Sequence, residues 1–161
     1  MDITAFVADL PNRRHSSSGS RLLNELKDAM IRRSPEPYAP TILIVDDDPN
    51  IQRLCRRILE ETGYFVTEAS SSKEALAAIE TTFFDLILLD LTMPEMDGFE
   101  FLKAVRGELP KLKIIIMSGF MPATMLPAAK LFGATATLAK PFSPDSLLSV
   151  VCQVLADSGP G

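Results

Sequence analysis

From Thr41 onward, apolar runs of strand length alternate with amphipathic stretches of helix length, and this alternation constrains the fold more than any other feature. The runs TILIV, YFVTEA, DLILLD, LKIIIM and TATLA predict strands at 41–45, 64–69, 85–90, 112–117 and 135–139. The stretches that follow them predict helices at 49–62, 71–80, 98–106, 122–132 and 144–156. Alternation with short loops forces a parallel sheet covered by helices on both faces. We therefore predict an α/β fold with a doubly wound, five-stranded parallel sheet, (βα)5.

Local signals mark several helix ends. Asp48 precedes Pro49, which favours Asp48 as an N-cap with proline in the first turn, and metal binding by Asp48 is the less favoured alternative. Gly63 is a stop signal for the helix at 49–62. Ser71 and Glu74 have the spacing of a capping box.

Three other elements carry positional information. The run DLILLD is apolar on both faces, so we expect this strand near the centre of the sheet. The segment 122–132 predicts a weaker helix, because Pro127 interrupts it. Ser143 and Pro144 predict the start of the last helix.

The first 40 residues differ in texture from the rest. Residues 1–40 mix serine, proline and arginine with short apolar pieces, which is typical of a flexible extension. Within it, 20–33 is amphipathic, and a helix there is marginal unless it docks on another surface. We expect 41–157 to form one domain and 158–161 to form a tail. The extension carries six Lys/Arg and five Asp/Glu, a net charge of +1, and the remainder carries ten and sixteen, a net charge of −6, which together give −5 for the chain.

Composition limits the classes of partner and compartment. No long basic run is present, which argues against nucleic acid as a direct partner. No apolar run approaches the length that spans a bilayer, and the N-terminus does not resemble a secretory signal, so we expect a cytoplasmic protein without membrane contact. Cys55 and Cys152 are expected to be reduced thiols rather than a disulfide framework, and His15 lacks the helical context of a phosphodonor histidine.

The residues after the predicted strands carry the chemistry. In a parallel sheet of this kind, ligands bind beyond the carboxyl ends of the strands. Those ends hold Asp46, Asp47, Asp90, Ser118 and Lys140. Three carboxylates in one crevice favour a hard cation such as Mg²⁺, and a carboxylate can also attack phosphorus to give an aspartyl phosphate. A lysine and a hydroxyl can bind phosphoryl oxygens. The set predicts Mg²⁺-dependent phosphoryl transfer onto an aspartate.

The same residues lie in motifs that resemble the receiver domain of two-component response regulators. The motifs are ILIVDDDPN, DLILLDLTMPEMDGFEFL, IIIMSG and GATATLAKPF, and the resemblance covers about 41–156. LLDLTMPEMDG together with KPF is the most specific part. The resemblance implies a flavodoxin-like receiver fold that takes phosphate from a sensor histidine kinase or a histidine phosphotransfer protein.

The resemblance also implies a role for each matching position. Asp90 would be the phosphoacceptor, and Asp46, Asp47 and Asp90 would hold Mg²⁺ with the backbone carbonyl of Thr92. Ser118 and Lys140 would contact the phosphoryl group. The Lys140–Pro141 bond would be cis, as is usual in the family.

Three features depart from the family pattern. Thr137 stands where an aromatic residue usually reports phosphorylation, so a switch must be reported elsewhere. Phe120 stands at a position that faces the phosphoryl site, and its bulk predicts slow autodephosphorylation. The face formed by the fourth helix, fifth strand and fifth helix of the domain is poor in charge, which argues against a salt-bridged dimer and favours a protein partner or the segment 20–33 as its cover.

The matching site residues and the departures from the family pattern together predict the function, with alternatives left open. We expect a single-domain receiver that signals by phosphorylation-dependent protein contacts or by phosphorelay, and not an enzyme beyond its own phosphorylation and autodephosphorylation. A dehalogenase-type phosphatase is disfavoured, because Thr92 stands where a second aspartate is needed. A binding module with altered or phosphorylation-independent readout remains the alternative. Arg53, Arg56 and Arg57 form either a solvated helix face or a docking site for the phosphodonor protein.

Overall fold

The computed structural model describes residues 38–94, 98–119 and 126–157, and the extension helix expected at 20–33 and the tail at 158–161 lie outside these ranges. Strands and helices alternate along the described chain. They are β1 (Thr41–Val45), α3 (Pro49–Glu61), β2 (Phe65–Ala69), α4 (Ser72–Thr81), β3 (Leu86–Asp90), α5 (Gly98–Glu108), β4 (Lys113–Ser118), α6 (Leu126–Leu131), β5 (Ala136–Ala139) and α7 (Pro144–Ala156).

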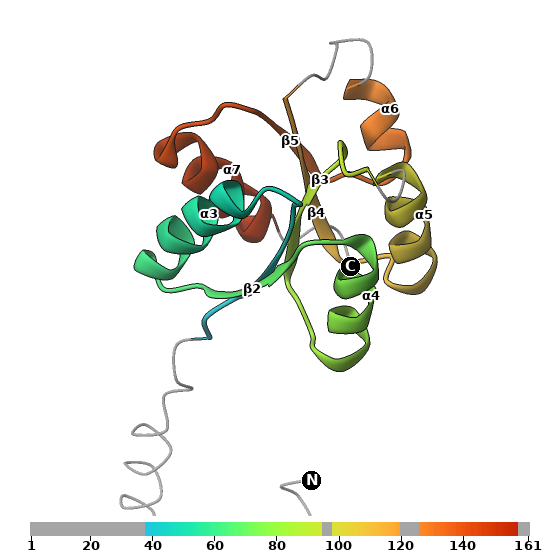
Figure 1. Ribbon diagram of the computed structural model, residues 1–161, viewed down its shortest axis with the longest axis horizontal. Coiled ribbons are helices and arrows are strands. Elements are labelled where there is room, and N and C mark those ends of the chain that lie inside the picture. Colours follow the sequence, from blue (N-terminus) through green and yellow to red (C-terminus); the bar gives the residue numbers. More distant parts are fainter. Residues whose placement is uncertain (1–37, 95–97, 120–125, 158–161) are drawn as a thin grey trace, which may run out of the picture. The chain divides into compact units, whose positions relative to one another are not determined.

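All five strands form one parallel sheet in the order β2-β1-β3-β4-β5. The strand order reverses between β1 and β3, which opens a crevice at their carboxyl ends. Helices α3 and α7 cover one face of the sheet, and α4, α5 and α6 cover the other (Figure 1). The prediction of a doubly wound parallel α/β fold is confirmed.

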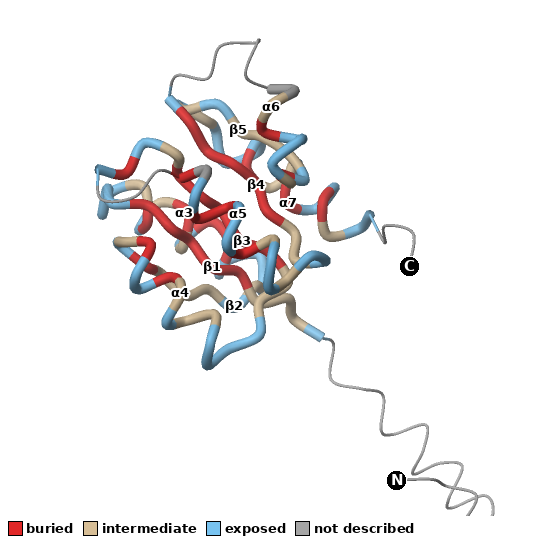
Figure 2. The backbone as a smooth tube through the Cα atoms, turned by 90° about the vertical axis from the view of Figure 1, so that its right-hand side faces the viewer, coloured by how far each residue is buried: buried red, intermediate tan, exposed pale blue. Residues whose placement is uncertain are grey.

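The core consists of two apolar layers, one on each face of the sheet. Alternate residues of β1 enter different layers: Leu43 and Val45 pack towards α4 and α5, while Ile42 and Ile44 pack towards α3 and α7. Strand β3 is buried along its whole length, and it lies in the middle of the sheet as its apolar sequence predicts (Figure 2). Among the described residues, no helix has both the length and the apolar character needed to cross a membrane.

The predicted helix caps are present at α3 and α4. Asp48 has an extended backbone, and its carboxylate accepts a hydrogen bond of 2.8 Å from the N–H of Asn50. Ser71 accepts from the N–H of Glu74 at 3.2 Å. The Glu74 carboxylate accepts from the N–H of Ser70 at 2.7 Å, one residue earlier than the box pattern predicts. Both caps satisfy first-turn N–H groups that the helix itself leaves unpaired.

Element boundaries differ from the sequence prediction by a few residues. Helix α3 ends at Glu61, and Gly63 follows with a φ of +96°, a conformation that glycine adopts without strain. Helix α6 spans Leu126–Leu131 with Pro127 as its second residue, and residues 122–125 of the predicted helix lie outside the described residues. Helix α7 has the predicted bounds, and Ser143 caps it by accepting from the N–H of Ser146 at 3.1 Å.

Candidate functional site

The sheet brings the predicted site residues to one edge. Asp46 and Asp47 follow β1, Asp90 ends β3, Ser118 ends β4 and Lys140 follows β5. The register pairs Val45 with Leu89 and Asp90 with Met117, so each site residue lies at the carboxyl end of its strand next to the others. Asp46, Asp90 and Ser118 are buried, Lys140 is half-buried and Asp47 is exposed.

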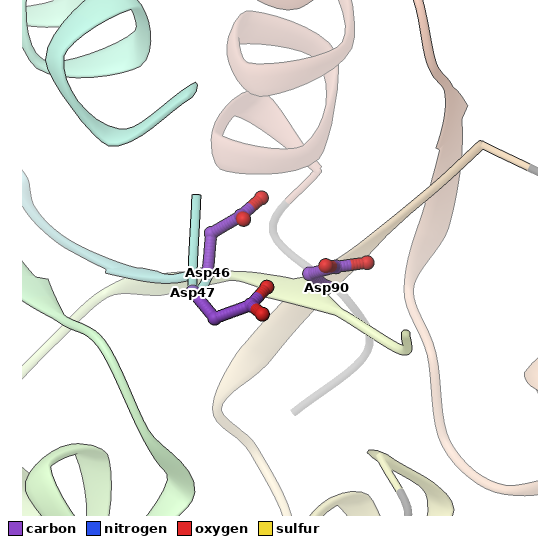
Figure 3. A group of neighbouring side chains, drawn as sticks. All are labelled: Asp46, Asp47 and Asp90. Atoms are coloured by element: carbon purple, nitrogen blue, oxygen red, sulfur yellow. The ribbon is translucent and has the colours of Figure 1, made fainter. Parts of the chain in front are cut away.

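Three carboxylates form the centre of the site. One oxygen from each of Asp46, Asp47 and Asp90 lies within 4.8 Å of the others, and Figure 3 shows the three side chains extending from two neighbouring strand ends into the same space. Carboxylates this close repel one another, and a divalent cation removes the repulsion. The ligands are all oxygens and one of them is open to solvent. This donor set fits Mg²⁺, which binds through few carboxylates and keeps several waters.

Lys140 supplies the positive charge of the site. Its Nζ lies 2.6 Å from Asp46 Oδ2 and 3.5 Å from Asp90 Oδ2, and its side chain is 16% exposed. Its backbone N–H donates to the carbonyl of Ser118 at 2.8 Å, which ties β5 to the end of β4. The Lys140–Pro141 peptide bond is cis, as the resemblance implies.

Burial and charge act against each other in this pair. Burial raises the pKa of Asp46, and the hydrogen bonds from Lys140 and from the Asp48 N–H offset this effect in part. Burial alone would lower the pKa of Lys140, but the hydrogen bond that it donates to Asp46 and the negative charges of Asp46 and Asp90 raise this pKa above its ordinary value. The ammonium is therefore held in its charged form beside the carboxylates.

Thr92 contributes more than the backbone carbonyl expected of it. Its hydroxyl lies 2.8 and 2.9 Å from the two oxygens of Asp90, and its N–H donates to Asp90 Oδ1 at 3.1 Å. The backbone part of this contact had a sequence signal, because an aspartate side chain commonly accepts from the N–H two residues on.

Gln52 was missed by the sequence analysis. It is 7% exposed, and its amide nitrogen contacts the carboxyl ends of both β1 and β2. The spacing could have found it, since Gln52 precedes the buried residues Cys55 and Leu59 by three and seven positions on one helical face.

Of the two single residues that depart from the family pattern, the structure describes one. Thr137 is half-buried in β5, where it pairs with Ile116 of β4, whereas Phe120 lies outside the described residues.

The three arginines of α3 all contact polar side chains. Arg53 donates to Asn50, Arg56 pairs with Glu60 and Glu68, and Arg57 lies 3.9 Å from Glu61. These contacts occur on a solvated face, and docking stays a prediction.

Comparison with known proteins identifies the family. Residues 42–152, more than half of the chain, match the response regulator receiver domain. The chain is 42% identical over 115 residues to an uncharacterized 14.6 kDa protein of Leptolyngbya boryana, a match that covers 70% of this chain and 87% of that protein. It is 34% identical over 114 residues to sporulation initiation phosphotransferase F of Bacillus subtilis, covering 71% and 92% of the two chains.

A solved structure shares the fold. The chemotaxis protein CheY4 of Vibrio cholerae is 35% identical, with a TM-score of 0.69 over 73% of this chain and 99% of that one. Three other curated relatives are longer regulators of transcription, and the chain spans only 22–24% of their length. Receiver domains are generally non-enzymatic signalling modules that bind Mg²⁺ through acidic residues and interact with histidine kinases or phosphotransfer proteins. The chain belongs to the family of response regulator receiver domains.

Proposed function

We propose that the chain accepts a phosphoryl group on Asp90 from a phosphohistidine and passes the signal on by protein contact or by phosphorelay. The observation that carries this proposal is the convergence of Asp46, Asp47 and Asp90 within 4.8 Å, with the Lys140 ammonium 3.5 Å from Asp90. This arrangement joins a carboxylate nucleophile, a cation site and a fixed positive charge at one open edge of the sheet. Residues 41–157 are the domain that performs the reaction.

The reaction needs little covalent chemistry from the protein. An oxygen of Asp90 attacks phosphorus, the P–N bond of the donor breaks, and the imidazole nitrogen keeps the electron pair. Asp46, Asp47 and the backbone carbonyl of Thr92 would hold Mg²⁺, which when bound neutralises the carboxylates and the phosphoryl oxygens. These residues would thereby lower the charge repulsion between the nucleophile and the incoming group.

The remaining residues orient the groups. Lys140 already contacts Asp46 and Asp90, so a small movement would bring its ammonium to the phosphoryl oxygens, where it would stabilise their negative charge. Ser118 would donate its hydroxyl to another of those oxygens. The hydroxyl of Thr92 lies within hydrogen-bond distance of both oxygens of Asp90, and because it has one proton and each oxygen has two lone pairs, a lone pair stays open for the attack on phosphorus.

Labelling with radioactive acetyl phosphate tests the proposal. We expect Mg²⁺-dependent, acid-stable and base-labile incorporation that is lost in Asp90→Asn and with EDTA. Asp157→Asn, an exposed position at the far end of α7, is the matched control and should label like the parent. Undiminished labelling of Asp90→Asn would contradict the assignment of the phosphoacceptor.

The downstream partner would bind the face formed by α6, β5 and α7. Leu131 and Phe132 at the end of α6 are 87% and 48% exposed, which leaves large apolar side chains available on this side of the domain. A pull-down with and without beryllofluoride tests whether phosphorylation controls this surface. Recovery of the same partner in equal amounts would favour the second candidate function, a phosphorylation-independent binding module, which the small residue Thr137 in β5 already makes worth testing.

A further inference from the structure

We propose that Gln52 is a positioning residue for the cation site, an inference that rests on the proposed function and extends it to a residue of α3. Burial of polar side chains concentrates around this site. Among the described residues, the buried polar or charged ones are Asp46, Gln52, Ser72, Asp90 and Ser118. Gln52 differs from the others in that its side chain reaches from a helix back to the carboxyl ends of two strands.

The amide of Gln52 joins the carboxyl ends of β1 and β2. Its Nε2 lies 2.8 Å from the carbonyl oxygen of Asp46 and 3.0 Å from that of Ala69, with the hydroxyl of Ser70 at 3.4 Å. The two strands are also joined directly at this level, because the N–H of Asp46 donates to the carbonyl of Ala69 at 3.2 Å. Gln52 therefore adds hydrogen bonds from α3 to the last backbone pair between β1 and β2.

The chemistry of the contact requires a carboxamide. Backbone carbonyls only accept hydrogen bonds, so the nitrogen of Gln52, with its two protons, must face the carbonyls of Asp46 and Ala69. Each proton serves one of the two shorter bonds. A glutamate at this position would place a carboxylate oxygen against two carbonyl oxygens, and an apolar residue would leave both carbonyls without this donor.

The bond to Asp46 acts on the cation site through the backbone. The carbonyl of Asp46 belongs to the peptide group that joins Asp46 to Asp47, so fixing it fixes the orientation in which both side chains leave the chain. Asp47 and Ser70 also line the same pocket of about 300 Å³, so the carboxyl end of β2 lies beside Asp47, the exposed carboxylate of the proposed cation site. Gln52 thus sets the separation of the β1 and β2 ends around the pocket. Partners of this kind, one shell outside the ligands, commonly change metal affinity about 10–100-fold when they are removed.

The helix holds Gln52 in place for this task. The N–H of Gln52 donates to the carbonyl of Asp48 at 3.1 Å, within the first turn that Asp48 caps. The N–H of Asp48 in turn donates to Asp46 Oδ1 at 2.9 Å. Side chain and backbone of Asp46 are therefore both tied to the start of α3, and Gln52 supplies the backbone half of that connection.

Mg²⁺ titration of the full chain, followed by the amide resonances of the site in ¹H–¹⁵N NMR spectra, tests the inference without any phosphodonor. Gln52→Met keeps the length and removes the donor, and we expect its Mg²⁺ dissociation constant to rise about tenfold. Gln52→Asn keeps the amide on a shorter arm and should give a smaller rise, and it serves if the methionine variant does not fold. Ile58→Val is the matched control, a buried change on the same helix that should leave Mg²⁺ affinity unchanged.

A second readout separates positioning from general destabilisation. In acetyl phosphate labelling, the Mg²⁺ concentration for half-maximal rate should rise in Gln52→Met while the maximal rate stays within about twofold of the parent. Mg²⁺ affinity of both Gln52 variants within twofold of the parent overturns the inference and leaves the proposed function standing. A parent chain whose site resonances do not respond to Mg²⁺ overturns the proposed function itself.

Discussion

Replacing Lys140 with methionine should destabilise the domain in a way that depends on both pH and Mg²⁺. The substitution keeps the length of the side chain and removes the ammonium that lies 2.6 Å from Asp46 and 3.5 Å from Asp90. The side chains of Asp46 and Asp90 are 0% and 3% exposed, so solvent screens their charges little once the ammonium is gone. At neutral pH the variant must either bury these charges unpaired or take up a proton.

The magnitude follows from how closed the site is. Removing one partner of a fully buried ion pair costs about 3–5 kcal/mol. Lys140 is itself 16% exposed and the neighbouring Asp47 is open to solvent, which moderates the loss. We therefore expect the free energy of unfolding at pH 7, measured with urea in EDTA, to fall by about 2–3 kcal/mol.

The pH dependence has a definite sign. Burial already raises the pKa of Asp46 in the parent, and without Lys140 that pKa rises further above its value in the unfolded chain. For a carboxyl group shifted in this direction, stability is fully present below the unfolded-state pKa and is lost as the pH rises through the folded-state pKa. The deficit of Lys140→Met should therefore shrink as the solution is acidified.

The effect of Mg²⁺ on the stability of Lys140→Met gives a second test. A cation bound among the three carboxylates replaces the missing charge and binds only the folded state, so saturating Mg²⁺ should restore much of the stability of the variant. Lys130→Met, which removes an exposed lysine on α6, is the matched control and should change stability little. A Lys140→Met variant as stable as the parent in EDTA at pH 7, or one that Mg²⁺ does not stabilise, would refute this account of the site.

Three further predictions concern residues around the site and in the core. Asp48→Ala should cost about 1 kcal/mol of unfolding free energy through loss of the α3 cap and leave acetyl phosphate labelling intact, and lost labelling would contradict the capping role. Phe120→Glu should shorten the phosphoryl lifetime if the bulk of Phe120 hinders the attacking water, and equal lifetimes in variant and parent would exclude that idea. Iodoacetamide at about pH 8 should modify the exposed Cys152 well before Cys55, because burial raises the pKa of Cys55 to about 12, and mass spectrometry of the peptides that shows equal modification would contradict the buried placement.

The fold was predictable because the apolar pattern of each strand indicates which of its faces are buried. A strand such as β3, apolar at every position before Asp90, must be covered on both faces, and the alternating helical stretches supply the cover, with α4 and α5 on one face and α3 and α7 on the other. The caps at Asp48 and Ser143 were predictable for a similar reason, since an N-cap depends on a few neighbouring residues. The start of α6 was harder to predict, because Pro127 disfavours a helix interior and is tolerated in a first turn, and the sequence alone does not distinguish the two.

The residues of the site were predictable from strand ends, but their contacts were not. Asp46, Asp90 and Lys140 each follow or end a strand, and the rule for parallel sheets places them together. That rule does not say that Lys140 contacts Asp46 more closely than Asp90, since side-chain separations depend on packing across the sheet. Gln52 shows the same limit, because its role comes from a helix meeting two strand ends, a contact between segments 17 residues apart.

The three consecutive aspartates show how one short sequence divides into separate tasks. Asp46 is buried and accepts from Lys140 and from the N–H of Asp48, so its charge is offset from inside the protein. Asp47 is exposed and borders the pocket, so it is the carboxylate of the three that faces solvent. Asp48 accepts from Asn50 and caps α3. The chain turns from strand to helix within these positions, and successive side chains therefore point in different directions. Their repulsion is spread over three environments, and only the part between Asp46, Asp47 and Asp90 remains to attract a cation.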